Sequence, residues 1–79
     1  TIVETRENDR DEVLIKKLAE RIRILRVTRR WSQEVLAELA GLHRNYMGHI
    51  ERGKVNIGLT NIGKLAAAFD MTVSELMTF

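Results

Sequence analysis

The spacing of apolar positions along the chain predicts helices throughout. Leu14, Leu18, Ile22 and Leu25 recur at intervals of three or four residues, which is the spacing of one face of an α-helix. No segment alternates apolar and polar residues over the length of a strand, and the sequence contains no proline. We therefore expect an all-α fold of five helices joined by short connections.

The first helix is expected to begin near Asp9 or Asp11, because either side chain can cap the free N–H groups of a helix start. It should end near residues 28–30. Residues 1–10 would then form a flexible N-terminal tail. Residues 11–79 would form a single domain that ends in a dimerisation helix.

Two short helices are expected on either side of Gly41. Ser32 is the predicted N-cap of the first of them, and Gly41 suits the left-handed conformation that often ends a helix. Trp31, just before Ser32, is expected to pack into the apolar core. The inward face of this helix is predicted to consist of Leu36, Ala37, Leu39 and Ala40.

The next helix, from His43 or Arg44 to Glu51, has two distinct faces. Met47 and Ile50 point to one side at about 100° per residue. The opposite side carries small or hydrogen-bonding residues, namely Asn45, Gly48, His49 and Arg52, with Arg44 beside them and Tyr46 on the flank. Such a helix can dock on a core through one face and present polar groups on the other. Gly53 is predicted to end it.

A fourth helix is expected over residues 59–69, with Asp70 in the left-handed position where glycine is more usual. Thr72 and Glu75 have the spacing of a capping box and predict a short fifth helix over residues 73–78. The apolar residues of this last segment are more than a small domain can bury, so they are candidates for a dimer interface. They are Val73, Leu76, Met77 and Phe79.

Charge and composition narrow the chemistry. The formal net charge is +2, but residues 11–30 alone carry +4, which fits either an anionic partner or a solvated helix face. There is no cysteine, and His43 and His49 have no partner ligands at metal-binding spacing. No nucleophile pattern or glycine-rich phosphate loop is present. We therefore expect no enzyme activity, no catalytic residue, no metal site and no cofactor.

No apolar run approaches the roughly 18 residues that a membrane helix needs, and the start of the chain has no signal-peptide pattern. We expect no membrane partner and a cytoplasmic, nucleoid-associated location.

These motifs together resemble the Xre/Cro-repressor type of helix-turn-helix domain, a five-helix DNA-binding fold. The matching stretches are IRILR (22–26), WSQEVLAELAGL (31–42), YMGHIERGKVNI (46–57) and LTNIGKLAAAFDMTVSEL (59–76). The run HRNYMGHIERG followed by Asn56 further resembles the controller proteins of restriction–modification systems. Those are small regulators that dimerise through a fifth helix.

A helix that enters the major groove needs side chains that match base edges, and three residues of the polar face meet this need. Arg44 can donate two hydrogen bonds to guanine, Asn45 can pair with adenine or reach a phosphate, and His49 can contact a base edge or a thymine methyl. Gly48 would let the helix approach DNA closely.

The resemblance assigns Gln33, at the start of the second helix, to the phosphate backbone. Further candidates for phosphate contacts are Tyr46, Arg52, Lys54, Asn56 and His43. Each of three has a structural alternative: Tyr46 can simply pack, while the structural role is favoured for Asn56, which would hold its own loop, and for His43, which would cap its helix or pack. The resemblance also implies a structural salt bridge between Arg26 and Glu51, which excludes both from base reading.

The sequence is therefore interpreted as a DNA-binding transcriptional regulator that acts as a homodimer on a near-palindromic stretch of double-stranded DNA. An autoregulating controller of a restriction–modification system is the most specific form of this hypothesis, with RNA polymerase as a candidate further partner. The main alternative is an antitoxin that binds a toxin protein and its own operator. The DNA-binding domain of a longer ligand-sensing repressor and a purely structural helical bundle are the remaining alternatives.

Overall fold

The computed structural model describes the backbone of residues 2–79 and the side chains from Arg10 onward. It consists of five helices in chain order, and residues 2–79 contain no strand. The predicted all-α, five-helix fold is confirmed. The helices are α1 (Ile2–Thr28), α2 (Gln33–Ala40), α3 (Arg44–Glu51), α4 (Leu59–Ala68) and α5 (Val73–Leu76).

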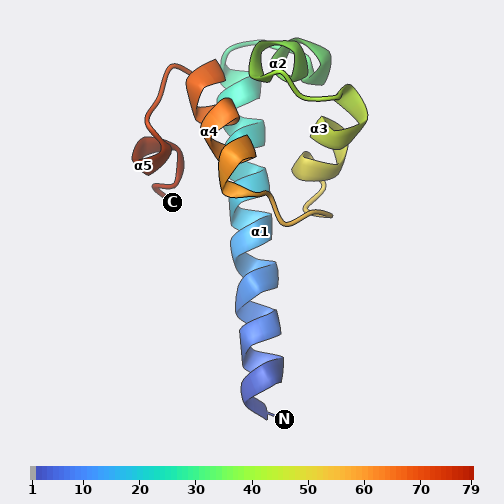
Figure 1. The fold of residues 1–79 in the computed structure, drawn as a ribbon, viewed down its shortest axis with the longest axis vertical. Helices are drawn as coiled ribbons and strands as arrows, with labels where there is room; N and C mark the ends of the chain where they lie inside the picture. Colours follow the sequence, from blue (N-terminus) through green and yellow to red (C-terminus); the bar gives the residue numbers. More distant parts are fainter. Residues whose placement is uncertain (1) are drawn as a thin grey trace.

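The start of α1 differs from the sequence expectation. The helix begins at Ile2 rather than near Asp9 or Asp11, so residues 2–10 are part of α1. The reason is that residues 2–28 contain neither glycine nor proline, so no residue stops the helix once it has formed. The N-terminal half of α1 projects from the helical cluster along the long axis of the molecule (Figure 1).

All five helices contribute to one apolar core. Ile22 of α1, Leu36 of α2, Leu65 of α4 and Leu76 of α5 are fully buried, together with Met47 of α3. The remaining buried apolar residues are Leu18, Ala19, Ala37, Ala40, Ile50, Ile57, Ala66 and Phe69. Because the core draws on every helix, the position of α3 depends on packing that extends across the whole domain.

Two residues predicted to point inward are exposed instead. Leu14 and Leu39 are each 54% exposed. Leu39 lies at the edge of the buried stripe of α2, where the core is already filled by Leu36, Ala37 and Ala40. Leu14 lies one turn before the buried Leu18 on α1 and lines an apolar hollow with Met77 and Phe79.

The helix ends follow the local signals in the sequence. Ser32 caps α2 by accepting a hydrogen bond from the Val35 N–H at 3.1 Å. Gly41 ends α2 with a φ of 69°, a left-handed conformation that an L side chain rarely adopts. Asp70 has a φ of 57°, as expected from the sequence, and Arg30 takes the same region with 59°.

Trp31 packs against the core as predicted, although it is only partly buried. Its ring is stacked on that of Phe69 with centroids 5.9 Å apart. The guanidinium of Arg29 lies over both rings and donates a hydrogen bond to the Phe69 carbonyl at 3.1 Å. This cluster fixes the connection between α1 and α2 to the end of α4.

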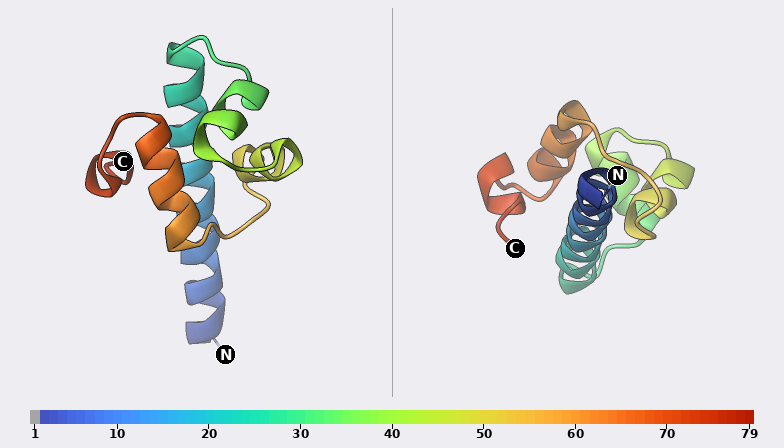
Figure 2. Two further views of the ribbon diagram at one scale, coloured as in Figure 1. Left: turned by 45° about the horizontal axis from the view of Figure 1, so that its top comes forward. Right: turned by 90° about the horizontal axis from the view of Figure 1, so that it is seen from below.

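The fifth helix is held by a cap and by one arginine. The predicted capping box is present, and the hydrogen bond from the Thr72 backbone N–H holds the pKa of the Glu75 carboxyl below its usual value. Arg21 of α1 donates hydrogen bonds to the carbonyls of Glu75 and Leu76, at 2.9 and 3.2 Å. The views in Figure 2 place α5 and α3 on opposite flanks of the molecule.

Leu76 must be removed from the predicted dimer surface. It is fully buried inside the protomer, because α5 turns this side chain toward α4 and the core. Val73, Met77 and Phe79 remain exposed, at 37%, 39% and 48%. Among the residues described, no helix combines the length and the apolar character needed to cross a membrane.

Candidate nucleic-acid interface

The polar face predicted for α3 is present and open to solvent. Met47 and Ile50 anchor the opposite side of the helix and are 0% and 1% exposed. Arg44, Asn45 and His49 are exposed on the outward side. The helix is therefore held by its apolar face and presents the three predicted base-reading residues on the surface.

His43 is the N-cap residue of α3. Its Nδ1 accepts a hydrogen bond from the Asn45 backbone N–H at 3.1 Å, so the imidazole caps α3. This is the capping role that the sequence offered as one alternative. A phosphate contact from His43 remains a prediction, and only the other ring nitrogen is free to make it.

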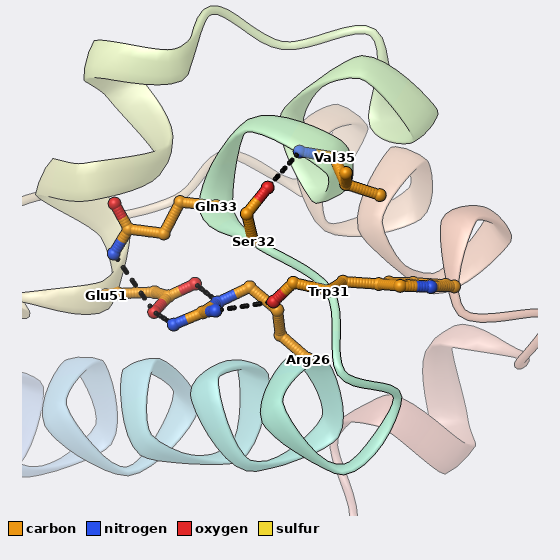
Figure 3. A network of polar contacts seen from close by, with 6 residues as sticks. All are labelled: Arg26, Trp31, Ser32, Gln33, Val35 and Glu51. Atoms are coloured by element: carbon orange, nitrogen blue, oxygen red, sulfur yellow. Dashed lines mark hydrogen bonds and ion pairs between the residues drawn. The ribbon is translucent and has the colours of Figure 1, made fainter.

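The predicted salt bridge between Arg26 and Glu51 is confirmed. The guanidinium donates from Nε and Nη2 to the two carboxylate oxygens at 2.7 and 2.9 Å, a bidentate arrangement (Figure 3). A third donor of Arg26 binds the Trp31 carbonyl at 2.7 Å. The Glu51 side chain is only 2% exposed. The pair thus ties the end of α3 to α1 and to the segment that leads into α2.

Gln33 belongs to the same network. Its side-chain amide donates to Glu51 Oε1 at 3.2 Å, which orients the side chain across the gap between α2 and α3 (Figure 3). Within the described residues the second N–H of this amide makes no hydrogen bond, so it is available to an outside acceptor. Because the first N–H groups of a helix lack intrahelical acceptors, the start of α2 offers further donors to an anion.

Arg44 is exposed but not free. Its Nη1 donates to Glu34 Oε1 at 2.7 Å, so an ion pair spans the outer ends of α2 and α3. Glu34 also lies in the first turn of α2, where the helix dipole favours an acidic side chain. The two residues are ten apart in the chain and lie on different helices, so no local pattern could have revealed the pair.

Gly48 is covered by a neighbouring side chain rather than left open. A Cβ at this position would lie 3.1 Å from Nη1 of Arg52, which folds back across the helix. Arg52 also contacts His49, with Nη2 to Nδ1 at 2.9 Å. Since arginine can only donate, the imidazole accepts through Nδ1. The absence of a side chain at Gly48 thus makes room for Arg52, a role not foreseen from the sequence.

These side chains surround an open polar hollow of about 360 Å³. It is lined by Gln33, Arg44, Asn45, Gly48, His49 and Arg52. Five of these six were predicted as base or phosphate contacts, and the sixth, Gly48, was assigned to the same face. The structure therefore brings the central part of the predicted site together, with cationic and amide donors directed at one surface.

The other predicted phosphate contacts lie outside this hollow. Tyr46 is half-buried against the core and accepts a hydrogen bond from Asn61 at 3.2 Å, which is the packing alternative. Lys54 is exposed on the loop after α3. Asn56 lines a separate apolar hollow beside α1. Within the described residues, no group of acidic and histidine side chains could hold a metal ion.

Comparisons with known proteins agree with this geometry. The helix-turn-helix family matches residues 22–76. A hypothetical transcription factor of Neisseria meningitidis serogroup B is 45% identical over 60 residues, which cover 76% of this chain and 57% of that protein. The control protein C.SmaI of Serratia marcescens is 44% identical over 61 residues, which cover 77% of this chain and 73% of that protein.

A solved structure extends the agreement to three dimensions. The restriction-modification controller protein C.AhdI from Aeromonas hydrophila matches with a TM-score of 0.75 and 48% identity, over 78% of this chain and 94% of that one. The chain therefore spans nearly the whole of that structure, but little more than half the length of the Neisseria protein.

Proposed function

The chain belongs to the helix-turn-helix family and is a DNA-binding regulator of the Xre type, and from this premise we propose that it is the autoregulating controller of a restriction–modification system. It would act as a homodimer, with the two α3 helices entering successive major grooves about 34 Å apart on a near-palindromic operator. The observation that carries the proposal is the exposed face of α3, which presents Arg44, Asn45 and His49 while the opposite apolar face is buried in the core.

Each side chain of this face suits a different part of DNA. Arg44 would read guanine, while Asn45 and His49 would contact neighbouring base edges. Gln33, Arg52, Lys54 and the N-terminus of α2 would hold the phosphates on either side. On a promoter-proximal operator the dimer would lie beside RNA polymerase, and it would reside on DNA in the nucleoid. The matched control proteins favour this function over that of an antitoxin.

Selection of bound sequences from random duplex DNA tests the proposal. The expected result is one preferred sequence with approximate two-fold symmetry, and its presence upstream of the gene for this protein would support autoregulation. Shift assays at several salt concentrations would then give the number of phosphate contacts from the slope of log affinity against log salt. Recovery of no preferred sequence would overturn the proposal.

Arg44→Ala is expected to weaken binding to the selected sequence by about 1–3 kcal/mol, because a bidentate contact with one guanine is lost. Discrimination at one base pair of each half-site should disappear, while preferences elsewhere stay. The measurement is a set of affinities for single-base variants of the selected duplex. An unchanged preference at every position would exclude Arg44 as a base reader.

Gln33→Ala should act differently, since a phosphate contact carries no sequence information. We expect binding to selected and scrambled duplexes to fall by a similar factor, with a free-energy change of roughly 1 kcal/mol. The Arg26–Glu51 pair stays bidentate without Gln33, so the fold should persist. Loss confined to the selected duplex would show that Gln33 reads a base instead.

A further inference from the structure

The ion pair between Glu34 and Arg44 places a carboxylate beside the proposed DNA surface. Glu34 Oε1 lies 2.7 Å from Nη1 of Arg44, the residue assigned to guanine. The two side chains come from the outer ends of α2 and α3 and are 66% and 67% exposed. A negative charge in this place is unexpected for a surface that must approach a polyanion.

Fold stability does not explain the pair. Exposed ion pairs contribute about 0–1 kcal/mol, because water screens the attraction and two long side chains lose freedom. The contacts that hold α2 against α3 lie elsewhere, in the buried core and in the network around Glu51. We therefore look for the effect of the ion pair in the way Arg44 binds DNA.

The carboxylate affects two possible ligands of Arg44 unequally. A backbone phosphate bears a full negative charge and is repelled by a carboxylate a few ångströms away, whereas the guanine edge is neutral and offers two acceptors. Arginine has five N–H donors, and the hydrogen bond to Glu34 uses one of them. Arg44 can therefore bind guanine while it keeps its contact with Glu34.

We propose that Glu34 is a specificity-determining residue, which disfavours complexes in which Arg44 contacts phosphate and so weakens binding to non-operator DNA. This inference rests on the proposed base-reading role of Arg44. Glu34 acts through its charge on the exposed guanidinium of Arg44. Removal of the Glu34 charge should therefore raise the affinity for non-operator DNA without destabilising the fold.

The test compares Glu34→Gln with wild type on two duplexes, the sequence selected from random DNA by the wild-type protein and a scrambled duplex of equal length and composition. Glutamine keeps the shape of the side chain and removes the charge. Affinity for the scrambled duplex should rise roughly three- to fivefold, as expected for one exposed charge, while affinity for the selected duplex changes less than about twofold. The ratio of the two affinities falls accordingly.

Glu38→Gln is the matched control. Glu38 is exposed one turn further along α2, and this change removes the same charge without affecting the ion pair between Glu34 and Arg44. It should leave the affinity ratio near that of wild type. An equal fall of the ratio in both variants would mean a general charge effect and would overturn the proposal.

A second comparison shows whether Glu34 works through Arg44. In an Arg44→Ala background, Glu34→Gln should no longer change the affinity for the scrambled duplex. The inference would be overturned if Glu34→Gln raised the affinity for the scrambled duplex equally with and without Arg44. It would also be overturned if Glu34→Gln left the affinity ratio unchanged, or lowered only the affinity for the selected duplex. Failure of the proposed function is separate, because it shows as the absence of any preferred sequence for the wild-type protein.

Discussion

Glu51→Ala is expected to lower the free energy of unfolding by about 3–5 kcal/mol, the usual cost of removing one partner from a buried ion pair. Glu51 accepts hydrogen bonds from Arg26 and Gln33, and its own side chain is 2% exposed. Its loss would leave the guanidinium of Arg26, itself only 14% exposed, without a counter-charge. A small domain has a total free energy of unfolding of about 5–15 kcal/mol, so this loss would remove a large share of the stability of the variant.

Urea unfolding followed by circular dichroism measures this loss, with Glu38→Ala as an exposed control that should change stability by less than about 0.5 kcal/mol. The double change Arg26→Met with Glu51→Leu separates two causes. It removes both charges together, so it should be less destabilised than Glu51→Ala alone. A Glu51→Ala protein within about 1 kcal/mol of wild type would show that Arg26 finds another partner or water.

The features that the sequence predicted best are those fixed by local chemistry. Ser32, Gly41 and the Thr72–Glu75 capping box each mark a helix end through contacts within a few residues, and all three occur as expected. The apolar anchor of α3 was also predictable, since Met47 and Ile50 are separated by almost one helical turn. Together with the resemblance to a known family, these signals predicted the order of the helices and the exposed polar face of α3.

The features that were missed depend on distant parts of the chain. An apolar stripe indicates which face of a helix is buried, but not how wide the buried part of that face is. Leu39 was therefore expected inside, whereas the packing of α2 leaves it exposed. Leu76 was expected on the surface because nothing in the sequence shows how deeply a one-turn helix can reach into the core. The start of α1 was placed too late because a capping residue permits a helix start without requiring one.

The state of the polar face could not be derived from residue spacing. Arg44 and Arg52 were predicted to contact DNA, and each is already hydrogen-bonded within the protein, the first to Glu34 and the second to His49. Whether an exposed arginine is free depends on rotamers and on the angle between α2 and α3, which are properties of the folded domain. Each arginine has N–H donors beyond the one used in these contacts, so both side chains can bind DNA while the contacts persist.

The surface proposed for dimerisation now consists of the exposed end of the chain together with α1. Met77 and Phe79 line an apolar hollow of about 200 Å³ with Leu14, and Val73 lies one turn before Met77 on α5. Leu14 thus joins the surface from which Leu76 is removed. Because α5 and α3 lie on opposite flanks, pairing through this surface leaves both α3 helices accessible to DNA (Figure 2).

Met77→Glu is therefore expected to give a monomer and to reduce affinity for the full two-fold operator by about 10²–10⁴-fold, the gain that linking two binding units provides. A charge placed in an apolar interface must lose its water or force the two copies apart. Affinity for a duplex with a single half-site should be almost unchanged, since α3 is untouched. Sedimentation equilibrium and shift assays on full and half operators measure the two effects separately.

Leu39→Glu is the matched control, because it adds the same charge at an apolar residue that is 54% exposed on α2, away from α5. It should remain dimeric and keep its preference for the full operator over the half-site. Thermal unfolding of both variants checks that the fold persists, as expected for replacements at exposed positions. If Met77→Glu remains a dimer with wild-type affinity for the full operator, the two copies must pair through another face, and the spacing of the α3 helices would then be set elsewhere.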